Sequence, residues 1–153
     1  MFKKLAVALD GSRSSEEALA VALELARTEG AGLAVCSVVD PITLAGTALP
    51  SPAMAIAIAD MERFALKLVT EAVERAGRSG IAASGETRCG APAFEIVAYA
   101  ERAGADAIVM GTRGLGGLRH FLMGSVAETV LREAKVPVIV VRERERERIP
   151  AHS

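Results

Sequence analysis

The chain has few aromatic residues and no excess of charge of either sign. Its 153 residues include no tryptophan, one tyrosine and four phenylalanines, so a core must be built from Ala, Val, Leu and Ile. Few aromatic rings also means few stacking platforms for single-stranded nucleic acid. The 18 basic and 19 acidic side chains give a net charge of -1, which excludes the broad positive field of general polyanion binders. We expect neither nucleic acid nor a membrane among the partners.

Cysteine and histidine are also scarce. Cys36, Cys89, His120 and His152 lack the paired spacing of a structural zinc site. Cys36 lies in an apolar stretch typical of a strand, where it is interpreted as a buried free thiol, and an absence of disulfides fits a reducing cytosol. Charges and prolines interrupt every apolar run before it reaches the length of a signal-peptide core or a membrane helix. The sequence therefore predicts a cytoplasmic protein.

Short apolar runs alternate with amphipathic stretches along the chain. Strands that are buried on both faces are predicted at 5–9, 33–39 and 107–110, a more polar edge strand at 82–88, and a fifth strand at 136–141. Helical periodicity and end signals predict helices at about 14–30, 56–76, 92–103 and 125–134. Strands that alternate with helices imply parallel crossover connections. The predicted fold is thus α/β, a three-layer sandwich around a five-stranded parallel sheet.

Two helix starts are predicted from capping boxes. Ser14 with Glu17, and Ser125 with Glu128, match the pattern in which a serine and a glutamate three residues later satisfy the first backbone donors. The punctuated stretch 41–53 is predicted to be a surface loop, and a lid or contact surface is the alternative.

The end of the chain alternates strictly between Arg and Glu from residue 142 to residue 148. The simplest interpretation is a solvated tail, so a domain at 1–142 and a charged tail at 143–153 are expected. The alternative is a continuation of the last strand that pairs with a second copy, because antiparallel self-pairing can set Arg opposite Glu.

A glycine-rich segment follows the predicted strand at 107–110. Residues 111–125, GTRGLGGLRHFLMGS, hold five of the 14 glycines, three basic or titratable side chains and no acid. In parallel sheets, ligands bind beyond the carboxyl ends of strands, and glycines with a helix start at Ser125 would present backbone donors to phosphate. The segment is neither a Walker A loop nor GxGxxG. These residues alone leave open a phosphate site or a plain glycine-rich connection.

The spacing Gly111-x2-Gly114-x9-Gly124-Ser125, followed by Val126-Ala127-Glu128, resembles the ATP-binding signature of the universal stress protein family. Asp10-Gly11-Ser12 and the strand end Val38-Val39-Asp40-Pro41 are similar to that family as well. The resemblance extends over residues 2 to 142.

The resemblance implies an adenine nucleotide alpha hydrolase-like sheet of order 3-2-1-4-5, with ATP and Mg²⁺ or Mn²⁺ between the first and fourth strands. Asp10 would lie near the ribose and the metal-phosphate region, and Ala8, where some ATP-binding members carry proline, would flank adenine together with Val38. The implied nucleotide contacts are Ala8, Asp10, Val38, Met110, Gly111, Arg113, Gly114, Gly124, Ser125 and Val126.

The function implied by the resemblance is that of an ATP-binding, nucleotide-responsive regulatory module in a stress response. The last strand, 136–141, is expected at an edge of the sheet, and because a bare apolar edge invites aggregation, we expect a homodimer that pairs through this strand. One alternative is a slow ATPase or phosphotransferase that uses Asp10 and the metal, although no general base is evident beyond Asp10 or Asp40. The other alternative is a dimeric scaffold that binds no nucleotide.

Overall fold

The computed structural model describes residues 1–42, 46, 50–112 and 123–144. These residues form a five-stranded parallel sheet in the order β3-β2-β1-β4-β5, which confirms the predicted fold. The strands are β1 (Lys4–Ala8), β2 (Gly32–Val39), β3 (Ala83–Cys89), β4 (Ala107–Gly111) and β5 (Val138–Val141). The helices are α1 (Arg13–Glu29), α3 (Pro52–Arg78), α4 (Pro92–Ala103) and α5 (Ser125–Glu133).

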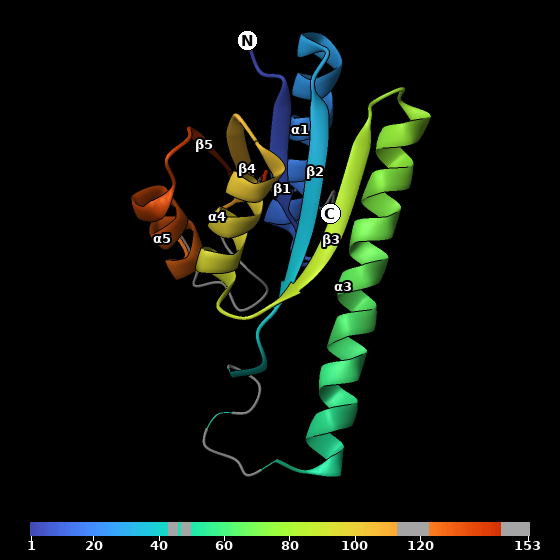
Figure 1. The fold of residues 1–153 in the computed structure, drawn as a ribbon, viewed down its shortest axis with the longest axis vertical. Helices are drawn as coiled ribbons and strands as arrows, with labels where there is room; N and C mark the ends of the chain where they lie inside the picture. Colours follow the sequence, from blue (N-terminus) through green and yellow to red (C-terminus); the bar gives the residue numbers. More distant parts are fainter. Residues whose placement is uncertain (43–45, 47–49, 113–122, 145–153) are drawn as a thin grey trace, which may run out of the picture.

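Helices cover both faces of the sheet, so the molecule has three layers. Successive strand residues point to opposite faces. On β1, Leu5 and Val7 pack into a cluster with α1 and α3, whereas Ala6 packs into a second cluster with α4 and α5. Figure 1 shows α4 and α5 in front of the sheet, α1 behind it, and α3 running beside β3 and on past the carboxyl ends of the strands.

Both predicted capping boxes are wrong in detail. The N-cap of α1 is Ser12, whose hydroxyl accepts a hydrogen bond from the backbone N–H of Ser15 at 3.2 Å, so Ser14 lies inside the helix. A capping residue needs extended backbone, and Ser12 has it with φ -72° and ψ 159°. The N-cap of α5 is Gly124, which makes no side-chain cap, and Ser125 is the first helical residue.

The two edge strands are β3 and β5, as predicted. Strand β5 ends at Val141, so the described part of the charged segment, Arg142–Arg144, does not continue the strand. Residues 145–153 lie outside the described part of the chain, as do residues 43–45 and 47–49 of the predicted loop at 41–53. None of the helices in the described ranges is long and apolar enough to cross a membrane.

The carboxylate of Asp106 fastens the amino end of β1 to β4. Its Oδ2 accepts hydrogen bonds from the backbone N–H groups of Lys3 at 2.6 Å and Lys4 at 2.9 Å. These bonds favour the ionised form and lower the pKa of Asp106 from its usual 3.8.

A lowered carboxyl pKa contributes stability that is present above the unfolded pKa and is lost as the pH falls through the folded pKa. Asp106→Asn keeps an acceptor oxygen but loses the charge. We therefore expect the variant to melt earlier than the wild type at pH 6, with a smaller difference below about pH 3. Thermal unfolding followed by circular dichroism from pH 2.5 to 7 would measure this; curves that differ by the same amount at every pH would contradict the assignment.

Candidate functional site

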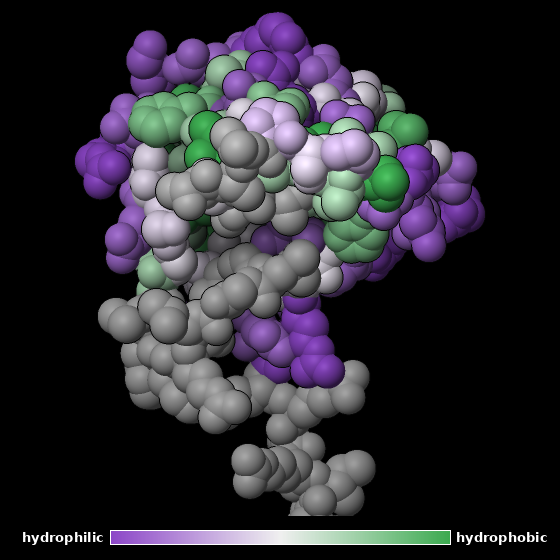
Figure 2. Space-filling view, turned by 90° about the horizontal axis from the view of Figure 1, so that it is seen from below, coloured by the Kyte–Doolittle hydropathy of each residue, from purple (hydrophilic) through white to green (hydrophobic). Residues whose placement is uncertain are grey.

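The strand order reverses between β1 and β4, because the chain first builds β2 and β3 on one side of β1 and then crosses to build β4 and β5 on the other. Such a switch point is where open parallel sheets bind ligands, beyond the carboxyl ends of the strands. Val7 of β1 pairs with Val109 of β4, so Ala8 and Met110 follow side by side. Figure 2 looks onto this end of the molecule, where hydrophobic and hydrophilic surface areas are interspersed.

Four of the expected contacts lie on one face of the sheet. Ala8, Val38 and Val126 are half-buried and pack against the cluster beneath α4 and α5, and Met110 belongs to that cluster with 5% of its surface exposed. They come from β1, β2, β4 and α5. The structure thus brings together an apolar surface at the switch point, and such a surface suits a flat, weakly polar group such as a purine ring.

Gly111 faces the opposite side of the sheet. A Cβ added there would lie 2.7 Å from the carbonyl carbon of Ser14 and 2.8 Å from its Cβ, so the end of β4 packs directly onto the first turn of α1. Only glycine leaves room for this approach. The glycine at this position is therefore explained by packing, whether or not it also contacts a ligand.

The start of α5 is held at the end of β4 by Thr112. The carbonyl of Thr112 accepts from the N–H of Gly124 at 2.7 Å, and the N–H of Thr112 donates to the carbonyl of Val141 at 3.0 Å. Among the residues that the structure describes, no side chain caps α5. The first N–H groups of a helix have no partner within the helix and carry its positive dipole end, so this helix start is suited to an anion. Sequence reasoning missed Thr112, whose position directly after the strand was the available signal.

Asp10 lies at the carboxyl end of β1, where it stabilises a turn. Its Oδ1 accepts a hydrogen bond from the N–H of Ser12 at 2.8 Å, and the turn continues through Gly11 at φ +85° with the ring of Phe64 packed against it. In this structure Asp10 therefore caps the turn that leads into α1. Among the described residues no group of three or more His, Cys, Asp or Glu is arranged to hold a metal ion.

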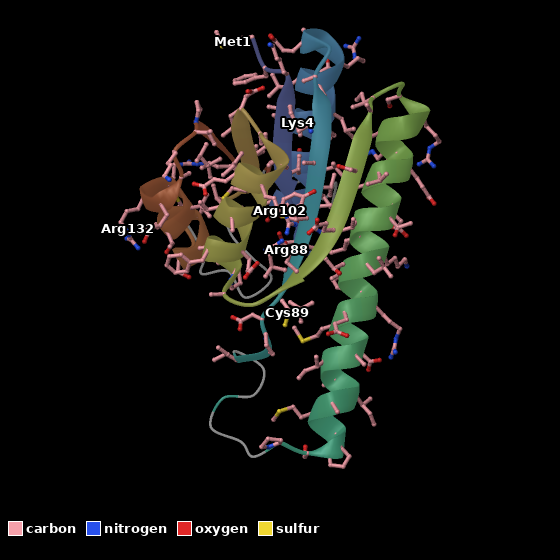
Figure 3. The ribbon with its side chains drawn as sticks, viewed as in Figure 1. Met1, Lys4, Arg88, Cys89, Arg102 and Arg132 are labelled. Carbon is pink, nitrogen blue, oxygen red and sulfur yellow. The ribbon has the colours of Figure 1, made fainter. Side chains whose placement is uncertain are left out.

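Arg113 and Gly114 lie outside the described residues, together with Arg119 and His120. On the α4 side of the sheet, Arg88 is the register partner of Val38. Its Nε lies 2.6 Å from Glu95, which raises the pKa of Arg88, and its NH1 lies 3.3 Å from Glu86, which also binds Arg102. Figure 3 shows Arg88 and Arg102 near one another in front of the sheet. Both are neutralised by carboxylates.

Cys36 is buried in the sheet as a free thiol, which confirms its interpretation from the sequence. Burial raises the pKa of Cys36 to about 12, so the thiol is protonated at neutral pH and is not a nucleophile. Cys89, at the end of β3, is exposed and also free.

The sequence model of the universal stress protein family matches residues 1–142. The chain belongs to this family. Universal stress protein YxiE of Bacillus subtilis (strain 168) is 34% identical, and the alignment covers 93% of this chain and all of YxiE. A universal stress protein of Methanocaldococcus jannaschii, MJ0531, is 37% identical over 96% of this chain and 86% of its own length.

Solved structures share the fold. The hypothetical protein MJ0577 superimposes with a TM-score of 0.82 at 25% identity, over 95% of this chain and 99% of that protein. A universal stress protein in complex with cAMP matches with a TM-score of 0.64 at 28% identity, over 94% and 98% of the two chains. A universal stress protein from Archaeoglobus fulgidus in complex with dAMP gives a TM-score of 0.62 at 25% identity, over 91% and 97%. Two of these structural relatives therefore bind adenine nucleotides.

Proposed function

We propose that this universal stress protein binds ATP at the carboxyl ends of β1 and β4 and acts as a nucleotide-responsive regulatory module. The observation that carries the proposal is the joining of an apolar surface to a helix start that no described side chain caps. The first suits adenine, the second suits phosphate, and Thr112 fixes the two together. The complexes of two structural relatives with cAMP and dAMP support an adenine nucleotide as the ligand.

In the proposed complex, Ala8, Val38 and Met110 contact the base. Gly124, Ser125 and Val126 at the start of α5 hold the phosphates, together with Gly111, Arg113 and Gly114 of the glycine-rich segment. The direct test is calorimetric titration with ATP, with GTP and inorganic triphosphate as comparators. ATP is expected to bind more tightly than inorganic triphosphate, which has no base, and more tightly than GTP, because guanine is more polar than adenine and suits an apolar surface less well.

The proposed function is binding rather than turnover. Asp10 and Asp40, the two acids considered as general bases, each accept a backbone hydrogen bond in a turn, from Ser12 and Ile42 respectively. Incubation with Mg-ATP is therefore expected to yield less than one ADP per chain. Multiple turnovers would favour the slow ATPase instead.

A divalent cation fits this site only when the phosphates of a bound nucleotide supply most of its ligands. Mg²⁺ is commonly held by one or two carboxylates together with substrate phosphates, and Asp10 offers one carboxylate at the switch point. Asp10 would bind the cation through its carboxylate, and the cation would supply charge neutralisation for the phosphates.

Asp10→Asn is expected to weaken ATP binding about tenfold in the presence of Mg²⁺ and by less than twofold in EDTA. The asparagine side-chain oxygen can still accept the hydrogen bond of Ser12, so the turn is preserved while the charge is lost. Dissociation constants measured with and without Mg²⁺ test this. Equal weakening in both conditions would assign Asp10 to the turn alone.

The outer edge of β5 is the proposed dimer interface. Pro137 and Val141 direct their carbonyls to β4, bonding the N–H groups of Ile108 and Thr112. Because backbone direction alternates along a strand, Val138 and Val140 present their N–H and C=O groups outward. All four residues of β5 are only half-buried, and no described strand pairs with its outer edge. An apolar edge of this kind invites pairing with a second copy.

Val140→Pro removes one outward donor per chain and is expected to shift the protein from dimer to monomer or aggregate. Val140→Ala keeps the donor and serves as the control. Sedimentation velocity at several concentrations distinguishes the species. A dimer that persists in Val140→Pro would place the interface elsewhere.

A further inference from the structure

The chain that leaves β5 crosses the first turns of α1 and forms two ion pairs there. Arg13 NH1 lies 3.2 Å from Glu143 Oε1, and Arg144 Nε lies 3.6 Å from Glu17 Oε2. Both arginine side chains are more than half exposed. Residues some 130 positions apart in the chain are thereby held together at the carboxyl edge of the sheet.

This ionic contact adjoins the proposed nucleotide site. Arg13 is the first residue of α1 and precedes Ser14, which packs onto Gly111 at the end of β4. On the other side, Glu143 follows Val141 by two residues, and Val141 is bonded to Thr112, which in turn is bonded to the start of α5. A continuous set of contacts therefore connects Arg13 and Glu143 with the place proposed for the phosphates.

Arg13 is well suited to alternate between two anions. A cation in the first turn of a helix is repelled by the positive end of the helix dipole. A nearby negative charge therefore stabilises it. Its present partner is a partly exposed carboxylate, and solvent-accessible ion pairs are weak and easily exchanged. Guanidinium groups bind phosphate oxygens in the same forked geometry as carboxylates. Arg88, by contrast, is already held by Glu86 and Glu95.

We propose that Glu143 competes with the nucleotide phosphates for Arg13, so that the first residues of the charged C-terminal segment restrain nucleotide binding. This inference rests on the proposed nucleotide site. Binding of ATP would break the Arg13–Glu143 pair, and loss of Glu143 would release Arg13 for the ligand. Adenosine has no phosphate, so its dissociation constant would not depend on the Arg13–Glu143 pair.

The test is a double-mutant cycle read out by ATP titration. Glu143→Gln is expected to lower the dissociation constant of ATP about two- to fivefold, the range of a weak ion pair, and Arg13→Gln is expected to raise it. In the Arg13→Gln background, Glu143→Gln should have no further effect. Glu101→Gln, the same charge change in an exposed ion pair with Lys135 near the end of α4, is the control and should leave ATP affinity unchanged.

Three results would overturn the inference, and they are distinguishable. If the wild-type protein binds no ATP, the proposed function fails and the inference fails with it. If ATP binds but Glu143→Gln leaves the dissociation constants of ATP and adenosine unchanged, only the competition is refuted. If Glu143→Gln tightens ATP binding equally in the Arg13→Gln background, Glu143 acts by general repulsion and Arg13 is not the shared partner.

Discussion

Gly111→Val is expected to lower the melting temperature by about 6 to 12 °C with no nucleotide present. The end of β4 lies so close to α1 that even a Cβ would come within 2.7 Å of the Ser14 carbonyl carbon, which is backbone and cannot rotate away. Overpacking of this kind costs about 3 kcal/mol, and a domain of this size loses roughly 2 to 4 °C per kcal/mol.

A pair of alanine substitutions isolates the packing effect. Gly111→Ala adds only the crowded Cβ and is expected to lower the melting temperature. Gly77→Ala adds a Cβ in open space within α3 and is expected to raise it slightly, because alanine is the better helix former. Ser14→Gly removes the Ser14 Cβ and hydroxyl and should partly rescue Gly111→Ala. If both alanine variants melt like the wild type, β4 and α1 are not packed this closely.

The close packing at Gly111 is also a feature that could not be predicted from the sequence. Its spacing from Gly114 and Gly124 identified a family signature, and the signature implied the correct strand order. It could not reveal that Gly111 points toward α1 while Met110, its neighbour, points toward α4, because which face a residue occupies near a ligand edge depends on tertiary packing.

Hydrophobic periodicity predicted the sheet and the helices well, because the same pattern of apolar residues recurs along the whole length of each buried strand and each amphipathic helix. The N-cap of a helix, by contrast, is a single residue, and the two N-caps predicted from capping boxes, Ser14 and Ser125, are wrong, whereas the predicted start of α4 at Pro92 is confirmed. Ser12 and Ser14 are both plausible N-caps in the sequence, and only the extended backbone at Ser12 selects it. The Arg13–Glu143 pair was also inaccessible, since 130 residues separate its members and alternating charges predict no particular partner.

Gly124 differs from Gly111 in a way that allows ligand binding to be tested apart from folding. It is the N-cap of α5 with φ -64° and ψ 156°, a conformation that any residue adopts without strain. A side chain there would instead lie beside the first N–H groups of α5, which are the donors proposed for phosphate. Substitution of Gly124 should therefore affect ATP more than the fold.

At a concentration one hundred times its dissociation constant, ATP with Mg²⁺ is expected to raise the melting temperature of the wild-type protein by about 5 to 10 °C. Binding to the folded state alone contributes about 2.7 kcal/mol under these conditions, and each kcal/mol is worth roughly 2 to 4 °C. Gly124→Val should lose this rise, because its methyl groups crowd the phosphate donors. Its melting temperature without ATP should fall by no more than about 4 °C, since valine is a poorer N-cap by about 1 kcal/mol.

Gly124→Ser separates the effect on stability from the effect on ATP binding, because we expect it to keep or raise the melting temperature without ATP but to reduce the thermal shift caused by ATP. A serine N-cap accepts a hydrogen bond from the first turn of the helix, so it should hold or slightly raise the melting temperature without ATP while it occupies a donor that phosphate needs. At the same ATP concentration, the thermal shift should therefore shrink in a protein that is at least as stable as the wild type. A full shift in Gly124→Ser would mean that the start of α5 does not hold the phosphates. A wild-type protein that shows no shift with ATP and Mg²⁺, and releases no nucleotide on denaturation, would favour the dimeric scaffold, because a ligand that binds only the folded state must stabilise it.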